Sequence, residues 1–595
     1  MARLALLLYE DKPQREQVLL ARTLEFFGVP CKMLALSALH ETSARPSDSV
    51  VFGSVADIAR ALRLAGANGN WGRDHAAFYA YAGPNRTAND VGLKALLQDE
   101  RVWFGAAPEE RVAARVSAAH VESLGAMAGI EALIQMRKDD AVLLGLQNGG
   151  LRAETLISIG AVPAYVRFWR ADIPIYLCAS SHMIDIEEEI RAGFYDVKEH
   201  FCSAVPLVSF IKSMFQEVAW QPQELGACLI IDDPLLKERY GACDFRLLRD
   251  LMQQYGFTTN IAFIPWNWWR TSRAASKLFG YGTGPFSISI HGCDHIKSEF
   301  GDSSPMVLLT RARLARERMQ RHEARTGIHH DPIMVFPQGV FSSACPEIMK
   351  RGGFLAAVNT EISPVDHSAR RARIRDVWDI ATMRYGNFPV FTRRYAHHGI
   401  ENFAFDLLLG KPCLIVAHHG FFGDQCAAWF RLLNQLQTRN CSLHWRPLGA
   451  VVRRACRRRT VGEGTIEVQM YGTELSFHNV DERPLRVLIS SHEADSAAIS
   501  EIQCNGEPSP WRIAQGRCSF ETTIPAKSER LFRILYRAPD QMSTCKQTVV
   551  FRSSVAARRV LSELRDASLG KFAAHSFAGK RPKETGKRND NWTAN

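Results

Sequence analysis

The stretch LIIDDPLL, residues 229–236, is an apolar run that leads into two adjacent aspartates and a proline. The apolar residues predict a buried β-strand, and Pro234, which cannot donate a hydrogen bond to a sheet, predicts that the strand ends there. An ionised carboxylate is costly to bury without a partner. Asp232 and Asp233 therefore belong either to a solvated turn after the strand or to a site in which they face a cation.

The same strand pattern recurs between residues 224 and 450. Helical stretches such as DFRLLRDLMQQYG (244–256) separate several of the predicted strands. Strands that alternate with helices predict a distorted (β/α) barrel, which we place at residues 221–450. The candidate polar residues follow the strands directly, which is where such folds place their functional sites. The predicted strands are ACLIIDD, TTNIAFIPW, FSISIHG, IMVFPQG, LAAVNT and CLIVAHHG.

Four further segments flank the barrel in the predicted multidomain α/β architecture. Residues 1–105 predict a small doubly wound α/β domain, Rossmann- or flavodoxin-like, without a G-x-G-x-x-G or P-loop motif. Residues 106–220 predict a β-rich accessory module, separate from or continuous with the first domain, and a helical connection. Alternating apolar and polar residues over 460–552 predict a β-sandwich. Residues 553–595 predict a helix and a basic disordered tail.

The composition indicates a soluble globular chain. Its 595 residues are 46% hydrophobic, with a mean hydropathy of −0.15. No apolar run approaches the roughly 20 residues that span a bilayer, and the N-terminal MARLALLLYEDKPQ predicts a first strand instead of a signal peptide. We therefore expect a cytoplasmic protein, with membrane association as an alternative. Fourteen cysteines without a C-x-x-C pair argue against a disulfide framework and a structural zinc knuckle.

Much of the net charge of +11 comes from two basic segments, RRACRRR (453–459) and GKRPKETGKRND (579–590). Either these segments are a solvated linker and a disordered end, or they contact an anionic surface. No nucleic-acid-binding motif accompanies them, so we expect no specific nucleic-acid partner.

Histidines follow two later strands of the predicted barrel. His291 and His295 form an H-x-x-x-H pair, and a helical turn would place both imidazoles on one face, where they can chelate one ion. Two histidines and one carboxylate leave coordination positions open, which suits a catalytic metal. His418 and His419 follow the strand CLIVA and are candidates for a general acid or base. For one of these two, a packed or surface histidine is the alternative.

Together these residues resemble the polysaccharide deacetylase family, also called carbohydrate esterase family four. The family's double aspartate is matched by Asp232 and Asp233, and its H-x-x-x-H motif by His291 and His295. Its third motif, Arg-x-Pro-Tyr-Gly, is matched in part by VFPQG (335–339). Its late leucine-x-histidine resembles VAH at 416–418. These motifs occur in the family's order.

The resemblance implies a role for each of these residues. Asp233, His291 and His295 would bind a divalent metal, with zinc the expected ion. Asp232 would be the general base that takes a proton from the attacking water. His418, preferred over His419 because it aligns with the family's histidine, would protonate the leaving group.

The third motif both supplies site residues and departs from the family. By the resemblance, Pro337, Gln338 and Gly339 line the substrate site, and the Gln338 backbone N–H stabilises the oxyanion. Val335 stands where the family has an arginine that supports the catalytic base. RDVWDI (375–380) loosely matches the fourth motif, which makes Asp376 and Trp378 supporting candidates.

The segment IPWNWWR (264–270) follows another predicted strand. Trp266, Trp268 and Trp269 are candidates for sugar stacking, and Asn267 could add a polar contact. The alternative is that these aromatic side chains belong to the core.

The expected function is a metal-dependent deacetylase that acts on an N- or O-acetylated saccharide, either a polysaccharide or a glycan precursor. A complex with other glycan-assembly proteins is a further expectation. The alternatives are a glycoside or amide hydrolase on the same barrel and a non-catalytic glycan-binding or assembly protein with a degenerate site. An iron oxygenase ranks last, because no jelly-roll pattern surrounds the histidines.

Overall fold

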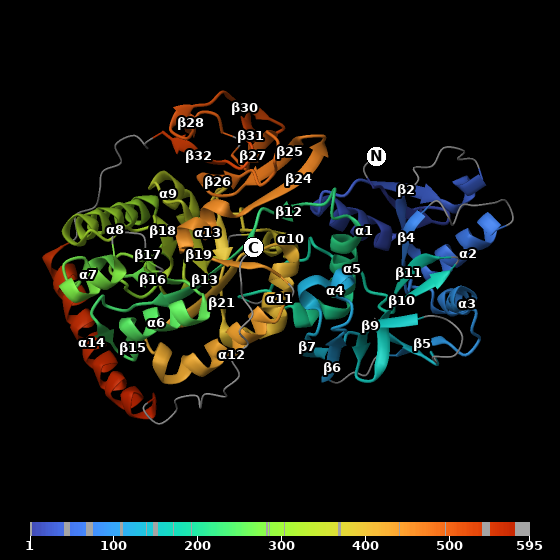
Figure 1. Ribbon diagram of the computed structural model, residues 1–595, viewed down its shortest axis with the longest axis horizontal. Coiled ribbons are helices and arrows are strands. Elements are labelled where there is room, and N and C mark those ends of the chain that lie inside the picture. Colours follow the sequence, from blue (N-terminus) through green and yellow to red (C-terminus); the bar gives the residue numbers. More distant parts are fainter. Residues whose placement is uncertain are drawn as a thin grey trace.

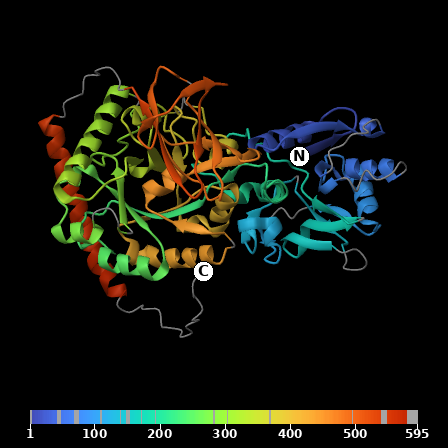
Figure 2. The ribbon, with the colours of Figure 1, turned by 45° about the horizontal axis from the view of Figure 1, so that its top comes forward.

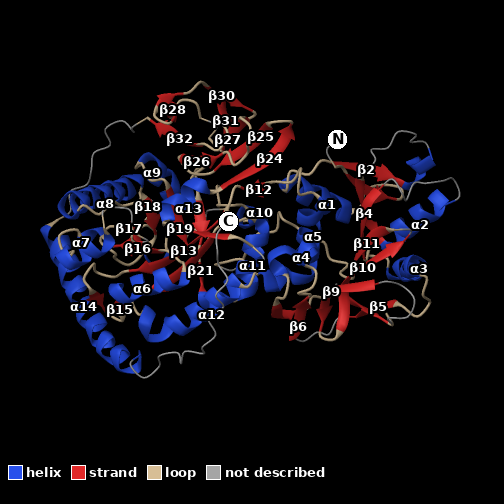
Figure 3. Cartoon of the chain, viewed as in Figure 1, coloured by secondary structure: helices blue, strands red, loops and turns tan. Residues whose placement is uncertain are grey.

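A computed structural model gives the fold of the chain (Figure 1). Grey segments in Figure 3 lie outside the described residues, and the predicted basic tail at 579–590 is among them. The structure describes residues 3–40, 48–66, 75–106, 111–138, 140–146, 153–170, 172–191, 193–280, 284, 286–302, 304–366, 370–439, 441–493, 495–537 and 548–577.

A barrel-like parallel sheet forms the centre of the molecule (Figure 1). Its strands lie in the order β20-β19-β18-β17-β16-β13-β22-β21, and β23 (Leu443–Trp445) pairs with β13 off this path. All of these pairings are parallel. The structure thus confirms the α/β class and the barrel-like sheet. The strands are β13 (Leu225–Asp232), β16 (Thr259–Phe263), β17 (Phe286–His291), β18 (Ile333–Val335), β19 (Ala356–Asn359), β20 (Val390–Thr392), β21 (Arg394–Tyr395) and β22 (Cys413–His418).

The two ends of this strand order are neighbours in the sequence. β20 pairs with β19, whereas β21, which begins two residues after β20 ends, pairs with β22. Residues 390–395 therefore bridge the two edges of the sheet. Arg393 stands between the two short strands, and its backbone N–H donates to the Asn359 carbonyl at 3.0 Å. Arg393 thus lies where the chain links the two edges of the nearly closed sheet.

Side chains that alternate along the strands fill the barrel interior. Ile230, Val358 and Leu414 belong to one buried cluster with Leu448 and Val451 of α13. A second cluster packs the outer face of the strands against the surrounding helices. The two clusters are formed by hydrophobic side chains, and the candidate site residues lie beyond them at the strand ends. The helices are α6 (Phe245–Tyr255), α7 (Arg273–Phe279), α8 (Pro305–Thr326), α9 (Cys345–Arg351), α10 (Ile374–Trp378), α11 (Ile400–Leu409), α12 (Cys426–Gln437) and α13 (Leu448–Arg454).

A second large sheet carries the N-terminal part of the chain. Its order is β2-β1-β3-β4-β11-β10-β9-β6-β7, parallel from β2 to β11 and antiparallel beyond. Strands from both sides of residue 105 pair in this one sheet, and the division into domains at that residue stays a prediction. The elements are β1 (Ala5–Tyr9), α1 (Arg15–Phe26), β2 (Cys31–Ala35), β3 (Ser49–Ser54), α2 (Val55–Gly66), β4 (His75–Tyr81), α3 (Arg86–Leu97), β6 (Arg111–Val116), β7 (Glu131–Gln135), β9 (Ala153–Ile159), β10 (Val162–Arg170) and β11 (Ile173–Cys178).

The C-terminal part forms two sheets and a long helix. The sheets have the orders β12-β24-β25-β27-β31-β30 and β26-β32-β28-β29, and they share one hydrophobic cluster. The long helix, α14 (Val549–Phe577), lies apart from these sheets and packs against the barrel (Figure 2). Of the described helices, none has the length and apolarity needed to cross a membrane. The strands are β12 (Gln221–Pro222), β24 (Cys456–Gly462), β25 (Thr465–Met470), β26 (Glu474–His478), β27 (Leu485–Ser491), β28 (Ile499–Cys504), β29 (Glu507–Pro508), β30 (Trp511–Ala514), β31 (Arg517–Ile524) and β32 (Glu529–Tyr536).

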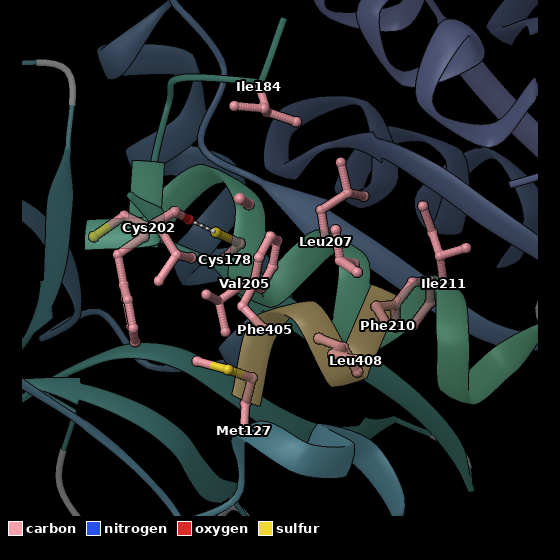
Figure 4. Packing of buried hydrophobic residues seen from close by; sticks show 14 of the residues in the cluster. Met127, Cys178, Ile184, Cys202, Val205, Leu207, Phe210, Ile211, Phe405 and Leu408 are labelled. Carbon is pink, nitrogen blue, oxygen red and sulfur yellow. Dashed lines mark hydrogen bonds between the residues drawn. The ribbon is translucent and has the colours of Figure 1, made fainter. Parts of the chain in front are cut away.

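A hydrophobic cluster joins the N-terminal sheet to the barrel. Helix α5 (Phe201–Met214) is buried along most of its length, and its Phe210 packs in the same cluster as Phe405 and Leu408 of α11 (Figure 4). Trp378 of α10 is fully buried in this cluster, with ring contacts to Phe26 and Phe405. The cluster fixes the two parts relative to one another.

Trp378→Ala should therefore destabilise the protein by about 3 to 5 kcal/mol, because it leaves a large cavity in this cluster. Urea unfolding followed by circular dichroism measures the change. Trp103→Ala is the matched control, because that side chain is 47% exposed, and we expect an effect within about 0.5 kcal/mol. Equal effects of the two substitutions would contradict the placement of Trp378 in the cluster that joins the N-terminal sheet to the barrel.

Candidate active site

The predicted catalytic residues lie at the same end of the barrel. Asp232 ends β13, His291 ends β17 and His418 ends β22. Because the strands are parallel, their carboxyl ends meet at one edge of the sheet. The register places Asp232 directly opposite His418 on the neighbouring strand. The structure thus brings together groups that are far apart in the sequence.

Asp233 and two imidazoles form a compact group of possible metal ligands. The Asp233 Oδ1 atom lies 3.2 Å from His291 Nε2 and 3.0 Å from His295 Nε2. His291 Nδ1 lies 2.9 Å from the Val335 carbonyl oxygen, which can only accept, so this nitrogen carries the proton. In the neutral imidazole, Nε2 then directs its lone pair toward the Asp233 carboxylate. Converging lone pairs of this kind are stabilised by a shared cation, so the residues fit a divalent metal.

Electrostatics in this group follow from burial and from the close contacts. Burial opposes ionisation of Asp233, but the imidazoles of His295 and His291 hold the pKa of its carboxyl well below the usual range. Burial likewise opposes protonation of His291, and the carboxylates of Asp232 and Asp233 outweigh it, so the pKa of this imidazole is raised. A buried carboxylate that stays ionised is the form that binds a cation.

The two histidines do not lie on a helical turn, and that part of the prediction is wrong. His291 is the last residue of β17, and His295 follows in a tight loop with a left-handed backbone, φ +55°. Asp233 has a similar backbone, φ +78°, immediately after β13. Such conformations are costly for residues other than glycine and persist only where the surroundings impose them.

The Glu299 carboxylate imposes the loop conformation. It accepts hydrogen bonds from the backbone N–H groups of Cys293 (3.0 Å), Asp294 (2.7 Å) and His295 (3.1 Å). Asp294 in turn pairs with Arg318 of α8 at 2.6 Å. Cys293, Asp294 and Glu299 lie close enough to hold a metal, but these hydrogen bonds make them the support of the His295 loop.

Asp232 is held by an arginine that the sequence reasoning missed. Arg393 Nη1 and Nη2 donate to the two carboxylate oxygens of Asp232, each at 2.7 Å, and both side chains are 3% exposed. Burial raises the pKa of Asp232, but the positive charge of Arg393 and the neighbouring imidazoles bring it below the usual value. Arg393 follows the apolar strand at 390–392, so its position after a strand was the available signal.

This contact explains the departure at Val335. The Val335 side chain is buried in the barrel interior, and only its carbonyl reaches the site, through His291. The guanidinium that faces Asp232 comes instead from the closing segment of the barrel, two strands away from β18 in the sheet order. The Asp232 carboxylate is therefore charge-paired without an arginine in the third motif.

His418 lies opposite Asp232 in the strand register and contacts Tyr395 and Gln425. Its Nε2 lies 3.2 Å from the Tyr395 hydroxyl, and its backbone N–H donates to Gln425 Oε1 at 2.9 Å. Among the described residues, His418 Nδ1 has no hydrogen-bond partner. His419 turns toward Tyr240, with ring centroids 5.7 Å apart.

The tryptophan segment follows β16 at the same end of the barrel. Arg318 lies over the Trp266 ring at 5.2 Å and Arg321 over the Trp268 ring at 5.8 Å. Trp269 is 44% exposed. Asn267 is buried, and its Oδ1 accepts from Arg270 at 3.5 Å. The segment thus presents one exposed indole and two half-buried ones.

The third-motif residues form a turn against the His291 loop. Gln338 has a left-handed backbone, φ +59°, and the Gly339 carbonyl accepts from Asn359 Nδ2 at 2.8 Å. A Cβ atom at Gly292 would lie 2.5 Å from Pro337 Cγ, so the turn packs tightly on that loop.

The two supporting candidates from the fourth motif do not join this group. The Asp376 carboxylate accepts from the Arg373 backbone N–H at 2.8 Å and pairs with Arg384 at 3.2 Å. Trp378 is in the cluster beside the N-terminal sheet. The short helix α10 carries both residues away from the catalytic end.

Comparisons with known proteins give weak structural matches. No protein-family model matches the chain, and no curated protein matches it. A crystal structure of Agd3, a novel carbohydrate deacetylase, is similar at a TM-score of 0.48 and 8% identity, covering 90% of this chain and 98% of that one. A family 4 carbohydrate esterase from Streptomyces lividans matches at a TM-score of 0.22 and 11% identity, over 36% and 86% of the two chains. At these values we infer function from the site and not from these neighbours.

Glu299→Gln should weaken divalent-metal binding by about 10- to 100-fold, because the backbone loop that presents His295 loses its carboxylate support. Isothermal titration with Zn²⁺ measures the affinity. Glu317→Gln, at an exposed position on α8, is the control and should bind as the unaltered chain does. Unchanged affinity in Glu299→Gln would show that the loop is held by other contacts.

Proposed function

We propose that the protein is a metal-dependent deacetylase of an N- or O-acetylated saccharide and a divergent member of the polysaccharide deacetylase family. One observation carries the proposal. The Asp233 carboxylate and two imidazoles converge beside a second carboxylate, Asp232, which is fixed by a bidentate arginine. The two adjacent aspartates then have different tasks, one on the metal and one on the attacking water.

Asp233, His291 and His295 would hold the metal, for which Zn²⁺ suits the mixed nitrogen and oxygen donors. When bound, the metal polarises the acetyl carbonyl and lowers the pKa of water. His291 is oriented for this task because its other nitrogen is engaged by the Val335 carbonyl.

Asp232 would accept the proton of the attacking water. Arg393 occupies one lone-pair direction on each carboxylate oxygen and leaves others available. His418, opposite Asp232 in the strand register, would protonate the leaving amine or alkoxide. The Gln338 backbone N–H would donate to the oxyanion from the turn that packs on Gly292.

The tryptophan segment would bind the sugar rings. Trp269 is exposed, and its ring centroid lies 5.6 Å from that of Trp266 and 5.8 Å from that of Trp268. A sugar ring stacks on the flat face of an exposed aromatic side chain. The pairing of Asp232 with Arg393 argues against a glycoside hydrolase, in which one carboxyl group must be kept protonated.

Asp233→Ala or His295→Ala should remove the bound metal and lower acetate release at least about 10²-fold, because each removes a ligand. Elemental analysis and an acetate assay on one acetylated oligosaccharide measure the two effects. The same reaction analysed for chain shortening tests the glycoside hydrolase alternative. Full activity of either variant contradicts the proposal.

Arg393→Lys should lower kcat by about 10²-fold, because a single ammonium cannot hold Asp232 through two parallel hydrogen bonds. Zn²⁺ affinity should change little, since Arg393 contacts no proposed ligand. Arg394→Lys is the matched control. Arg394 forms a similar buried pair with Asp406, at 2.6 and 3.2 Å, so it should lower thermal stability and leave kcat near its original value. Equal losses of kcat would show that both arginines act only on stability.

A further inference from the structure

Helix α14 lies across the end of the barrel that carries the candidate site. It packs against β14 (Arg239–Tyr240), which follows β13, and against the short helix η8 (Phe421–Gln425), which follows β22. Arg270, which follows β16 and the tryptophan segment, forms an ion pair with Glu563 of α14. β22, β13 and β16 are neighbours in the sheet. The helix thus contacts segments that follow three consecutive strands of the sheet.

These three strand ends carry most of the proposed chemistry. They hold His418, the two aspartates and the tryptophans. Arg559 of α14 is half-buried on this side, and Asp233 and Tyr240 are among the groups that act on it electrostatically. The same guanidinium acts on His295. The positive charge of Arg559 is therefore within electrostatic range of the carboxylate that would bind the metal.

The contacts that hold α14 in place are few among its described side chains. Val555 is its one buried large apolar residue, and the pair between Arg270 and Glu563 is the one ion pair that ties it to the barrel. An ion pair that is only partly buried contributes little to stability. Five large apolar residues of the helix are between 54% and 80% exposed, namely Val549, Val550, Val560, Leu561 and Leu564. A helix held this way can separate from the barrel without disturbing its core.

We propose that α14 is an autoinhibitory cover of the candidate site, and that its docking and the binding of a divalent cation at Asp233 oppose one another. The cover blocks access of a saccharide to the three strand ends. A divalent ion at Asp233 repels the Arg559 guanidinium, so the ion favours release of the helix. By linkage, release of the helix favours the ion to the same degree. This inference rests on the proposed function where it names the ion.

The test uses the full chain and Glu563→Arg, which turns the ion pair with Arg270 into a repulsion. We expect faster amide hydrogen exchange over residues 549–564 and faster modification of His295 by diethyl pyrocarbonate, measured by mass spectrometry. Zn²⁺ should bind about 5- to 10-fold more tightly. The exchanged pair, Arg270→Glu with Glu563→Arg, should restore all three values. In the unaltered chain, Zn²⁺ should speed amide exchange in α14.

Glu521→Arg is the control, because that glutamate forms an exposed pair with Arg486 on a C-terminal sheet. It should behave as the unaltered chain. Release of α14 without faster modification of His295 would overturn the proposal that the helix covers the site. Val555→Asp provides a second way to release the helix, and if neither variant releases it, the assignment of these contacts is wrong. If no variant binds Zn²⁺, the proposed function and the opposition to the ion both fail, whereas modification of His295 still decides whether α14 covers the site.

Discussion

The bidentate pair between Arg393 and Asp232 connects the closure of the barrel to its chemistry. Arg393 stands where two short strands meet the opposite edges of the sheet, and its guanidinium holds the carboxylate at the end of β13. Removing either partner would leave an uncompensated charge in a dry interior, which is strongly destabilising. The link between the two edges of the barrel sheet and the orientation of Asp232, the proposed base, therefore depend on the same interaction.

The proposed metal ligands depend on a different constraint, the backbone. Asp233 and His295 both adopt left-handed conformations, and three backbone N–H groups converge on Glu299 beneath the loop. The conformational cost at His295 is offset by these buried hydrogen bonds. Directly adjacent aspartates can then serve separate tasks, because the turn at Asp233 takes its side chain out of the strand alternation that would place it on the opposite face of the sheet.

Helix α14 adds a third element whose position owes little to hydrophobic burial. Among its described side chains, Glu563 forms an ion pair with Arg270 and Val555 is the one large apolar residue that is buried, and the positive charge of Arg559 acts on the carboxylate of Asp233. Ion pairs thus hold Asp232 within the candidate site and help to hold α14, the proposed cover, in place. The candidate site thus combines three parts. Asp232, the proposed base, is held by two short hydrogen bonds, the loop of the proposed ligand His295 has a strained backbone, and α14 is held by few contacts among its described side chains.

The sequence alone predicted six of the barrel strands and the polar residues that follow them, because apolar periodicity and the position of polar residues after strands are local patterns; the short strands β20, β21 and β23 were not predicted. Asp232, Asp233, His291, His295 and His418 were found in this way. Arg393 was not found, because it follows a strand of only three residues, Val390–Thr392, that was not predicted, and its pairing with Asp232, 161 residues away, is set by the tertiary structure. Tertiary structure also decided that the H-x-x-x-H pair spans a strand end and a loop, that Trp378 is core, and that α14 lies over the site. Each of these features depends on contacts between segments that are far apart in the sequence. Such contacts are determined by packing, and the periodicity of the sequence does not encode them.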